Sequence, residues 1–123
     1  MGDALDITVR RERGVVIAAV TGDVDISTVA RLRECLFELA DSGRPLIVDL
    51  NRVTFTDSSG LGALIGAARR AAAHGSSLHA ACARPPTRRL LWLTGVDRRI
   101  PLAATVCRSN IELHGLNWAY AVW

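Results

Sequence analysis

Hydrophobic residues come in two patterns along this chain: short runs rich in valine and isoleucine, and longer stretches in which leucine, valine or alanine recurs every three or four residues. The short runs are typical of strands, and the longer stretches are typical of helices with one buried face. The predicted strands lie at residues 7–9, 15–20, 46–50, 77–82 and 102–107. The predicted helices follow Asp25, begin near Leu61, and follow the two prolines at 85–86.

The order of these elements is strand, strand, helix, strand, helix, strand, helix, strand. Helices that alternate with strands predict an α/β fold, in which right-handed crossovers build a mostly parallel sheet of about five strands. A polar turn with Gly14 separates the first two strands. We therefore expect a hairpin there, which makes the first strand an antiparallel edge strand. The apolar run 46–50 is expected to be covered on both faces.

Polar segments between the elements predict turns, loops and one boundary. Residues 21–25 are expected to form a turn in which Asp25 caps the first helix. Residues 51–56 are expected to form a loop that leads into the second helix. The sequence predicts a domain at residues 1–108 and a C-terminal tail at 109–123, which holds two of the three tryptophans and the only tyrosine. This tail is expected to pack, as a short helix, on the domain or on a partner.

Composition and charge narrow the functional classes. The chain has 123 residues, of which 50% are hydrophobic and 22% charged, so it can bury a core as one domain. No apolar run approaches the roughly 18 residues of a membrane span, and the first residues lack the basic region of a secretory signal. We expect a soluble, cytoplasmic protein without a membrane partner. The net charge is +3, all 15 basic residues are arginine, and aromatic residues are only 5%, which argues against direct nucleic-acid binding.

Three cysteines, Cys35, Cys82 and Cys107, lie far apart in the sequence. They form no Cys-x-x-Cys pair and no cysteine–histidine cluster, so no metal site is predicted. The chain contains no lysine and no phosphate-binding glycine loop, so no cofactor is predicted either. Cys82 and Cys107 end the last two predicted strands and are a candidate redox pair, although buried free thiols are the simpler interpretation.

The candidate chemistry lies in the segment Thr-Asp-Ser-Ser-Gly at residues 56–60. It stands between an apolar strand and a helix, at the carboxyl edge of the predicted parallel sheet, where open α/β sheets place their working surface. Aspartate and serine can cap a helix there. Capping accounts for one such residue and less well for four consecutive small or polar ones.

Three segments carry a family resemblance. Residues 53–64, VTFTDSSGLGAL, resemble the signature of the STAS domain family, specifically of bacterial anti-sigma factor antagonists. Residues 22–25 resemble the Gly-x-x-Asp turn of that family, and residues 88–96 resemble its third helix. The match runs from about Asp6 to about Cys107 and includes the predicted order of elements.

The resemblance implies a regulatory protein and not an enzyme. Such a protein, when unphosphorylated, binds an anti-sigma factor and thereby releases a sigma factor for transcription. The anti-sigma factor is also a serine protein kinase, its phosphorylation of the antagonist breaks the complex, and a serine phosphatase resets the cycle. The family's phosphorylated serine maps to Ser58. The partner-binding positions map to Asp25, Thr56, Asp57, Ser58, Ser59, Gly60 and Leu61.

Two alternatives stay open at this point. A serine hydrolase would use Ser58 or Ser59 as its nucleophile, but the Gly-x-Ser-x-Gly elbow is absent, and His74, His79 and His114 are isolated in the sequence. The other alternative keeps the STAS fold as an interaction module that phosphorylation does not control, with redox control through the cysteines as one variant. The oligomeric state is not determined by the sequence.

Overall fold

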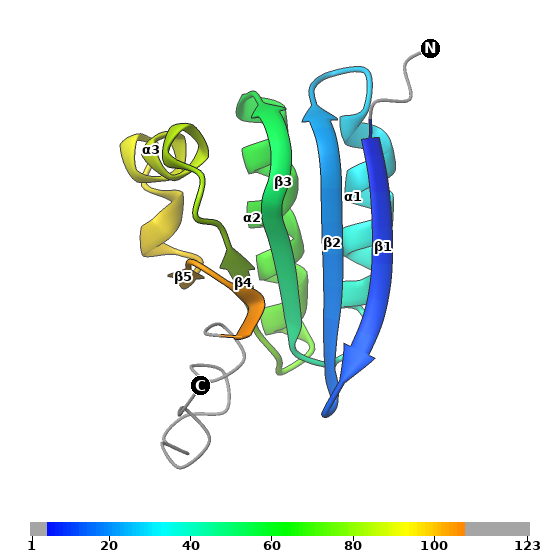
Figure 1. Ribbon diagram of the computed structural model, residues 1–123. Coiled ribbons are helices and arrows are strands. Elements are labelled where there is room, and N and C mark those ends of the chain that lie inside the picture. Colours follow the sequence, from blue (N-terminus) through cyan, green and yellow to red (C-terminus); the bar gives the residue numbers. More distant parts are fainter. Residues whose placement is uncertain (1–4, 108–123) are drawn as a thin grey trace.

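A five-stranded sheet and three α-helices make up residues 5–107, the part of the chain that the computed structural model describes (Figure 1). The elements are β1 (Leu5–Glu12), β2 (Val15–Val24), α1 (Val29–Ala40), β3 (Leu46–Thr56), α2 (Ser58–Ala73), β4 (Leu78–Ala81), α3 (Pro85–Leu93), the short 3₁₀ helix η1 (Val96–Arg98) and β5 (Leu102–Ala103). The strands lie side by side in the order β1-β2-β3-β4-β5. The pair β1–β2 is antiparallel and all other pairs are parallel. The predicted α/β fold with an antiparallel edge strand is confirmed.

The hairpin between β1 and β2 closes through Arg13 and Gly14, since Glu12 pairs with Val15. Both turn residues have positive φ, 54° at Arg13 and 82° at Gly14. A two-residue turn of this kind matches the right-handed twist of the strands it joins. Glycine adopts such a φ without strain, and this explains its place in the turn.

Alternate residues of the central strands face opposite sides of the sheet. Val16, Ala18 and Val48 belong to the large core, where α1 and α2 lie side by side on one face of the sheet (Figure 1). Ile17 and Ile47 form a second buried cluster with Val15, Ala81 and the partly buried Val106. The apolar run 46–50 is therefore buried on both faces, as predicted for a central parallel strand.

The contact between α1 and α2 depends on a missing side chain. A Cβ at Gly66 would lie 2.8 Å from the ring of Phe37, so glycine lets this ring approach α2. The guanidinium of Arg70 lies 4.7 Å from the centre of the same ring, within cation–π range. Arg70 also pairs with Asp41 at 2.6 Å, beyond the end of α1. These contacts hold α2 against α1.

Two predicted turns prove to be strand. Residues 21–25 and 51–56 were expected as turn and loop, but β2 continues to Val24 and β3 to Thr56. The two extensions pair with each other, with register shifts between Ala19 and Thr21 and between Gly22 and Asp23. Pairing satisfies the backbone while polar side chains point outward, and so a polar sequence forms strand here.

The last predicted strand, 102–107, is wrong in length. Only Leu102 and Ala103 form strand, paired with Ala80 and Ala81 of β4. The pairing stops because β4 ends at Ala81, after which its chain turns toward α3. The predicted tail, 109–123, lies outside the described residues. Within residues 5–107, none of the helices has both the length and the apolar character that a membrane crossing requires.

Candidate functional site

The ends of β2 and β3 bring two loops together at one edge of the sheet. The last residues of the two strands, Val24 and Thr56, are paired, and the Asp57 N–H donates to the Val24 carbonyl at 3.2 Å. Asp25, which follows Val24, therefore lies near the start of α2. The predicted candidates from both loops meet at this edge.

Asp57 is the N-cap of α2. Its backbone is extended (φ −108°, ψ −171°), and its Oδ1 accepts hydrogen bonds from the Ser59 N–H at 2.9 Å and from the Ser59 hydroxyl. Such a cap satisfies one of the free N–H groups at a helix start. Both Asp57 and the Ser59 hydroxyl are thus engaged in holding the first turn of α2, and both side chains are half-buried.

Ser58 has a different environment from its neighbour. It is the first residue of α2, it is exposed, and its hydroxyl bonds to no other residue in the described part of the chain. The N-terminus of a helix carries a partial positive charge and free N–H groups, which favour a bound or attached anion. The Ser58 oxygen is accessible to a docking protein, which a phosphorylated serine requires.

Gly60 and Leu61 lie beneath this surface. Both are buried, Leu61 with 5% of its surface exposed. A Cβ at Gly60 would lie 2.7 Å from Val24 Cγ1 and closer still to Thr56 Oγ1, so α2 starts directly on the sheet because residue 60 has no side chain. The burial of Gly60 and Leu61 argues against direct partner contact and for a supporting role.

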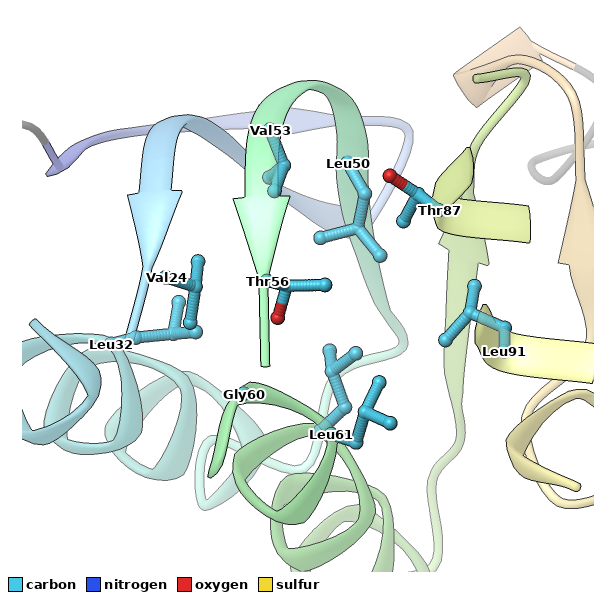
Figure 2. A pocket seen from close by; sticks show the side chains of 10 residues that line it. Val24, Leu32, Leu50, Val53, Thr56, Gly60, Leu61, Thr87 and Leu91 are labelled. Carbon is cyan, nitrogen blue, oxygen red and sulfur yellow. The ribbon is translucent and has the colours of Figure 1, made fainter. Parts of the chain in front are cut away.

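A small apolar pocket continues below Gly60, between the sheet, α2 and α3 (Figure 2). Figure 2 shows the side chain of Thr56 from β3 pointing toward Leu61 of α2, with Thr87 and Leu91 of α3 on the other side. The Thr56 hydroxyl donates to the Asp57 carbonyl at 3.2 Å. Thr56 is half-buried and supports the turn into α2 from the pocket side.

Asp25 orders the turn before α1. Its carboxylate accepts hydrogen bonds from the Ser27 hydroxyl at 2.6 Å, from the Ser27 N–H at 2.9 Å and from the Thr28 N–H at 3.2 Å. These hydrogen bonds, the Ser27 hydroxyl first, hold the pKa of Asp25 below its usual value. The helix itself starts at Val29, with Thr28 as its N-cap, so Asp25 caps the preceding turn and not the first turn of α1.

Two exposed apolar residues at this edge were missed from the sequence. Ile26 is 83% exposed, directly after Asp25, and Phe55 is 53% exposed near the end of β3, paired in the ladder with Asp23. The signal was present: each is a single large apolar residue in a polar segment that does not fit the buried pattern. Large apolar side chains on a surface mark sites of protein contact when they lie together.

The candidate redox pair loses its structural basis. All three cysteines are free; Cys82 is buried and Cys107 is exposed. The pairing assumed that both cysteines end adjacent strands, but β5 ends at Ala103, four residues before Cys107. Burial raises the pKa of the Cys82 thiol, and this opposes its conversion to the reactive thiolate.

The serine hydrolase interpretation lacks a base near Ser58 among the described residues. His74 follows the far end of α2, a helix of 16 residues, which places it about 24 Å from Ser58. His79 pairs with Ile47 in the sheet, about 30 Å of strand from the end of β3. His114 lies outside the described residues. Within residues 5–107, no group of three or more histidine, cysteine or acidic side chains could hold a metal ion.

The fold and this site define a class. The chain belongs to the STAS domain family, whose sequence model matches residues 6–108. Its relatives include the anti-sigma-F factor antagonist RsfB of Mycobacterium tuberculosis, which is 30% identical over 105 residues. The match spans 85% of this chain and 85% of RsfB.

Solved structures of anti-sigma factor antagonists share the fold of this chain. An anti-sigma factor antagonist from Mycobacterium paratuberculosis superimposes with a TM-score of 0.86 at 25% identity, over 93% of this chain and 97% of that one. SpoIIAA in its unphosphorylated form gives a TM-score of 0.73 at 20% identity, over 90% of this chain and 98% of that one. The phosphorylated form of SpoIIAA from Bacillus gives a TM-score of 0.66 at 21% identity, over 87% of this chain and 98% of that one. The SpoIIAA likenesses establish the common fold.

Proposed function

We propose that this chain is an anti-sigma factor antagonist that acts in the cytoplasm. In its unphosphorylated state it binds an anti-sigma factor and so releases a sigma factor for transcription. The observation that carries this proposal is the Ser58 hydroxyl, exposed at the first residue of α2 and without a hydrogen-bond partner among the described residues. The class of partner follows from the relatives, which are antagonists of anti-sigma factors.

The proposed switch is phosphorylation of Ser58 by the anti-sigma factor, acting as a serine kinase with ATP and magnesium. A phosphate adds about −1.5 to −2 charges at a place where the helix N-terminus can accept it without unfolding the domain. SpoIIAA, which keeps this fold in its phosphorylated form, supports that argument. A serine phosphatase would return the chain to its binding state.

The added charge acts as a switch because the surface around Ser58 would be buried when the anti-sigma factor docks. Asp57 already places negative charge next to Ser58, and Asp25 follows Val24, whose carbonyl accepts from the Asp57 N–H at the same edge of the sheet. Within an interface, the phosphate would lose its water next to these carboxylates. Burial of an unpaired charge costs several kcal/mol, which is comparable with the margin that keeps a regulatory complex together.

We assign the main apolar contacts of this interface to Ile26 and Phe55. Both are more than half exposed, at 83% and 53%; Ile26 lies in the turn before α1, and Phe55 lies near the end of β3, three residues before Ser58. Buried apolar anchors supply most of the affinity of a typical protein interface.

We expect Ile26→Ser and Phe55→Ser each to weaken anti-sigma factor binding about tenfold or more, because each removes an apolar contact. Neither variant is expected to lose stability, because neither side chain is in the core. Calorimetric titration of the cognate anti-sigma factor measures this effect, and wild-type affinity in both variants would contradict the assignment.

Variants of Ser58 test the proposed function. Ser58→Ala is expected to bind the cognate anti-sigma factor as wild type does, and to keep binding when ATP is added. Ser58→Glu is expected to bind weakly in a pull-down. Ser42→Glu places the same charge on an exposed serine after α1 and is expected to bind normally. Equal binding by the alanine and glutamate variants of Ser58 would refute the switch.

Labelled ATP separates this proposal from a STAS module that phosphorylation does not control. With the cognate kinase, wild type and Ser59→Ala are expected to take up label, while Ser58→Ala takes up none. The reason is that the Ser59 hydroxyl is half-buried and donates to Asp57, whereas the Ser58 hydroxyl is exposed and unbonded. Label that persists in Ser58→Ala would place the acceptor elsewhere.

A further inference from the structure

The positive charge of this protein is concentrated in α3 and η1. Residues 84–99 contain five arginines and one aspartate, a charge of +4. The whole chain carries +3, so all remaining residues together carry −1. Arginine replaces lysine throughout the sequence, so the choice of arginine does not mark this segment. The excess of positive over negative charge does mark it. The five residues are Arg84, Arg88, Arg89, Arg98 and Arg99.

These arginines are not neutralised within the described part of the chain. None of the five forms an ion pair there, whereas Arg10 and Arg70 each pair with a carboxylate elsewhere. Arg89, Arg98 and Arg99 are exposed. The acidic residue of this segment, Asp97, is half-buried and pairs with none of them. Within residues 5–107, the exposed arginines of this segment therefore form a basic surface that no carboxylate pairs with.

Two large apolar side chains are exposed on the same segment as these arginines. Trp92 is 65% exposed and Leu93 is 60% exposed. Arg89 lies three residues before Trp92 and four before Leu93, so all three share one face of α3. The opposite face buries Thr87 and Leu91 against the pocket under α2. We call Arg89, Trp92 and Leu93 the α3 face; the exposed Arg98 and Arg99 follow at η1, which contacts α3.

We propose that the α3 face is a second docking surface, which binds an acidic protein surface with an apolar pocket for Trp92. Tryptophan and arginine are the residues most enriched at the energetic centres of interfaces. An exposed tryptophan one helical turn from an exposed arginine, with two more exposed arginines in the next element, complements a surface of carboxylates around a hollow. Figure 1 shows α3 on the other side of α2 from α1, at the same end of the sheet as the tips of β2 and β3. Thr87 and Leu91 line the pocket together with the start of α2, so the exposed face of α3 is turned away from the Ser58 site.

The chemistry of the face favours a protein over the other anionic partners. A membrane surface would need a longer apolar stripe than two side chains on a helix of nine residues. Single-stranded RNA would need several aromatic rings for its bases, and Trp92 is the one aromatic residue between positions 84 and 99. Both partners therefore enter the experiment as competing probes.

The test uses the purified full-length chain and three probes. These are a fluorescent amphipathic helix made of glutamate and leucine, vesicles of phosphatidylglycerol, and a single-stranded RNA. Anisotropy at low salt is expected to show binding of the acidic helix that salt weakens. Trp92→Ala and Arg89→Glu are each expected to reduce its affinity about tenfold or more.

Two controls make the result specific to this face. Arg33→Glu changes the net charge by the same amount at an exposed position on α1, and is expected to leave the affinity within about twofold. Ser58→Glu is expected to leave it unchanged, which separates this surface from the proposed switch. Trp92 and Arg89 are exposed, and circular dichroism verifies that the variants fold. No binding of the acidic helix, an equal loss in Arg33→Glu, or tighter binding of vesicles or RNA would each overturn the proposal.

Discussion

Adjacent residues of this site differ in what they do because their side chains meet different surroundings. Asp57 and Ser59 hold the first turn of α2 through hydrogen bonds to each other, and this leaves Ser58 as the free hydroxyl. Gly60 contributes by having no side chain, since it lets the helix begin against Val24 and Thr56. The four positions divide capping, exposure and close packing between them.

The role of Gly60 gives a stability prediction. Gly60→Ala forces a methyl group against Val24 and Thr56, which are both β-branched and stiff, so it is expected to destabilise the protein by about 1–3 kcal/mol. Gly62→Ala, in the same helix, meets no atom within 4 Å and is expected to stabilise it by about 0.5–1 kcal/mol. Urea denaturation measures both. A Gly60→Ala protein as stable as Gly62→Ala would show that residue 60 has room.

At the scale of elements, the turn before α1 depends on an ionised carboxylate. The hydrogen bonds that lower the pKa of Asp25 stabilise its charged form in the folded state. Their contribution is therefore fully present above the unfolded pKa of about 3.9 and is lost as the pH falls through the lower folded pKa. The turn positions Ile26, so its order bears on the proposed interface.

Asp25→Asn tests this dependence on charge. The variant is expected to unfold at a lower urea concentration than wild type near neutral pH. The gap between the two midpoints is expected to close as the pH is lowered toward about 3 and below, because wild type then loses the same charge. A gap that stays constant down to acid pH would mean that the carboxylate charge does not matter.

The sequence predicted elements with a clear apolar period and missed those defined by pairing across the sheet. The central strands and all three helices have buried faces that the spacing of valine and leucine indicates. The ends of β2 and β3 are strand because they pair with each other through bulges, which no local pattern records. The short β5 depends on where β4 ends. In the candidate site, the motif predicted Ser58 as the functional serine, while the exposure of Ile26 and Phe55 needed the folded chain.

At the scale of the whole molecule, the three thiols report how the domain opens. Cys107 is exposed, Cys35 is half-buried and Cys82 is fully buried beside the end of β4. Burial raises the pKa of the Cys35 and Cys82 thiols, so both react slowly while the domain is folded. Cys82 can meet a reagent only when the sheet opens.

Alkylation under native conditions tests this order. Cys107 is expected to react first, Cys35 more slowly, and Cys82 at a rate that follows global unfolding in urea. Peptide mass spectrometry assigns each thiol. Loss of the Cys82 and Cys107 thiols together under mild oxidation, restored by a reductant, would instead favour redox control.

The central claim concerns one oxygen atom and is tested most directly on one protein in two states. The cognate anti-sigma factor is titrated by calorimetry into the chain before and after stoichiometric phosphorylation, with the modified residue identified by mass spectrometry. We expect phosphate on Ser58 alone and a loss of affinity of about a hundredfold or more, equivalent to about 3 kcal/mol. Equal affinity of the two states, or phosphate on another residue, would contradict the account.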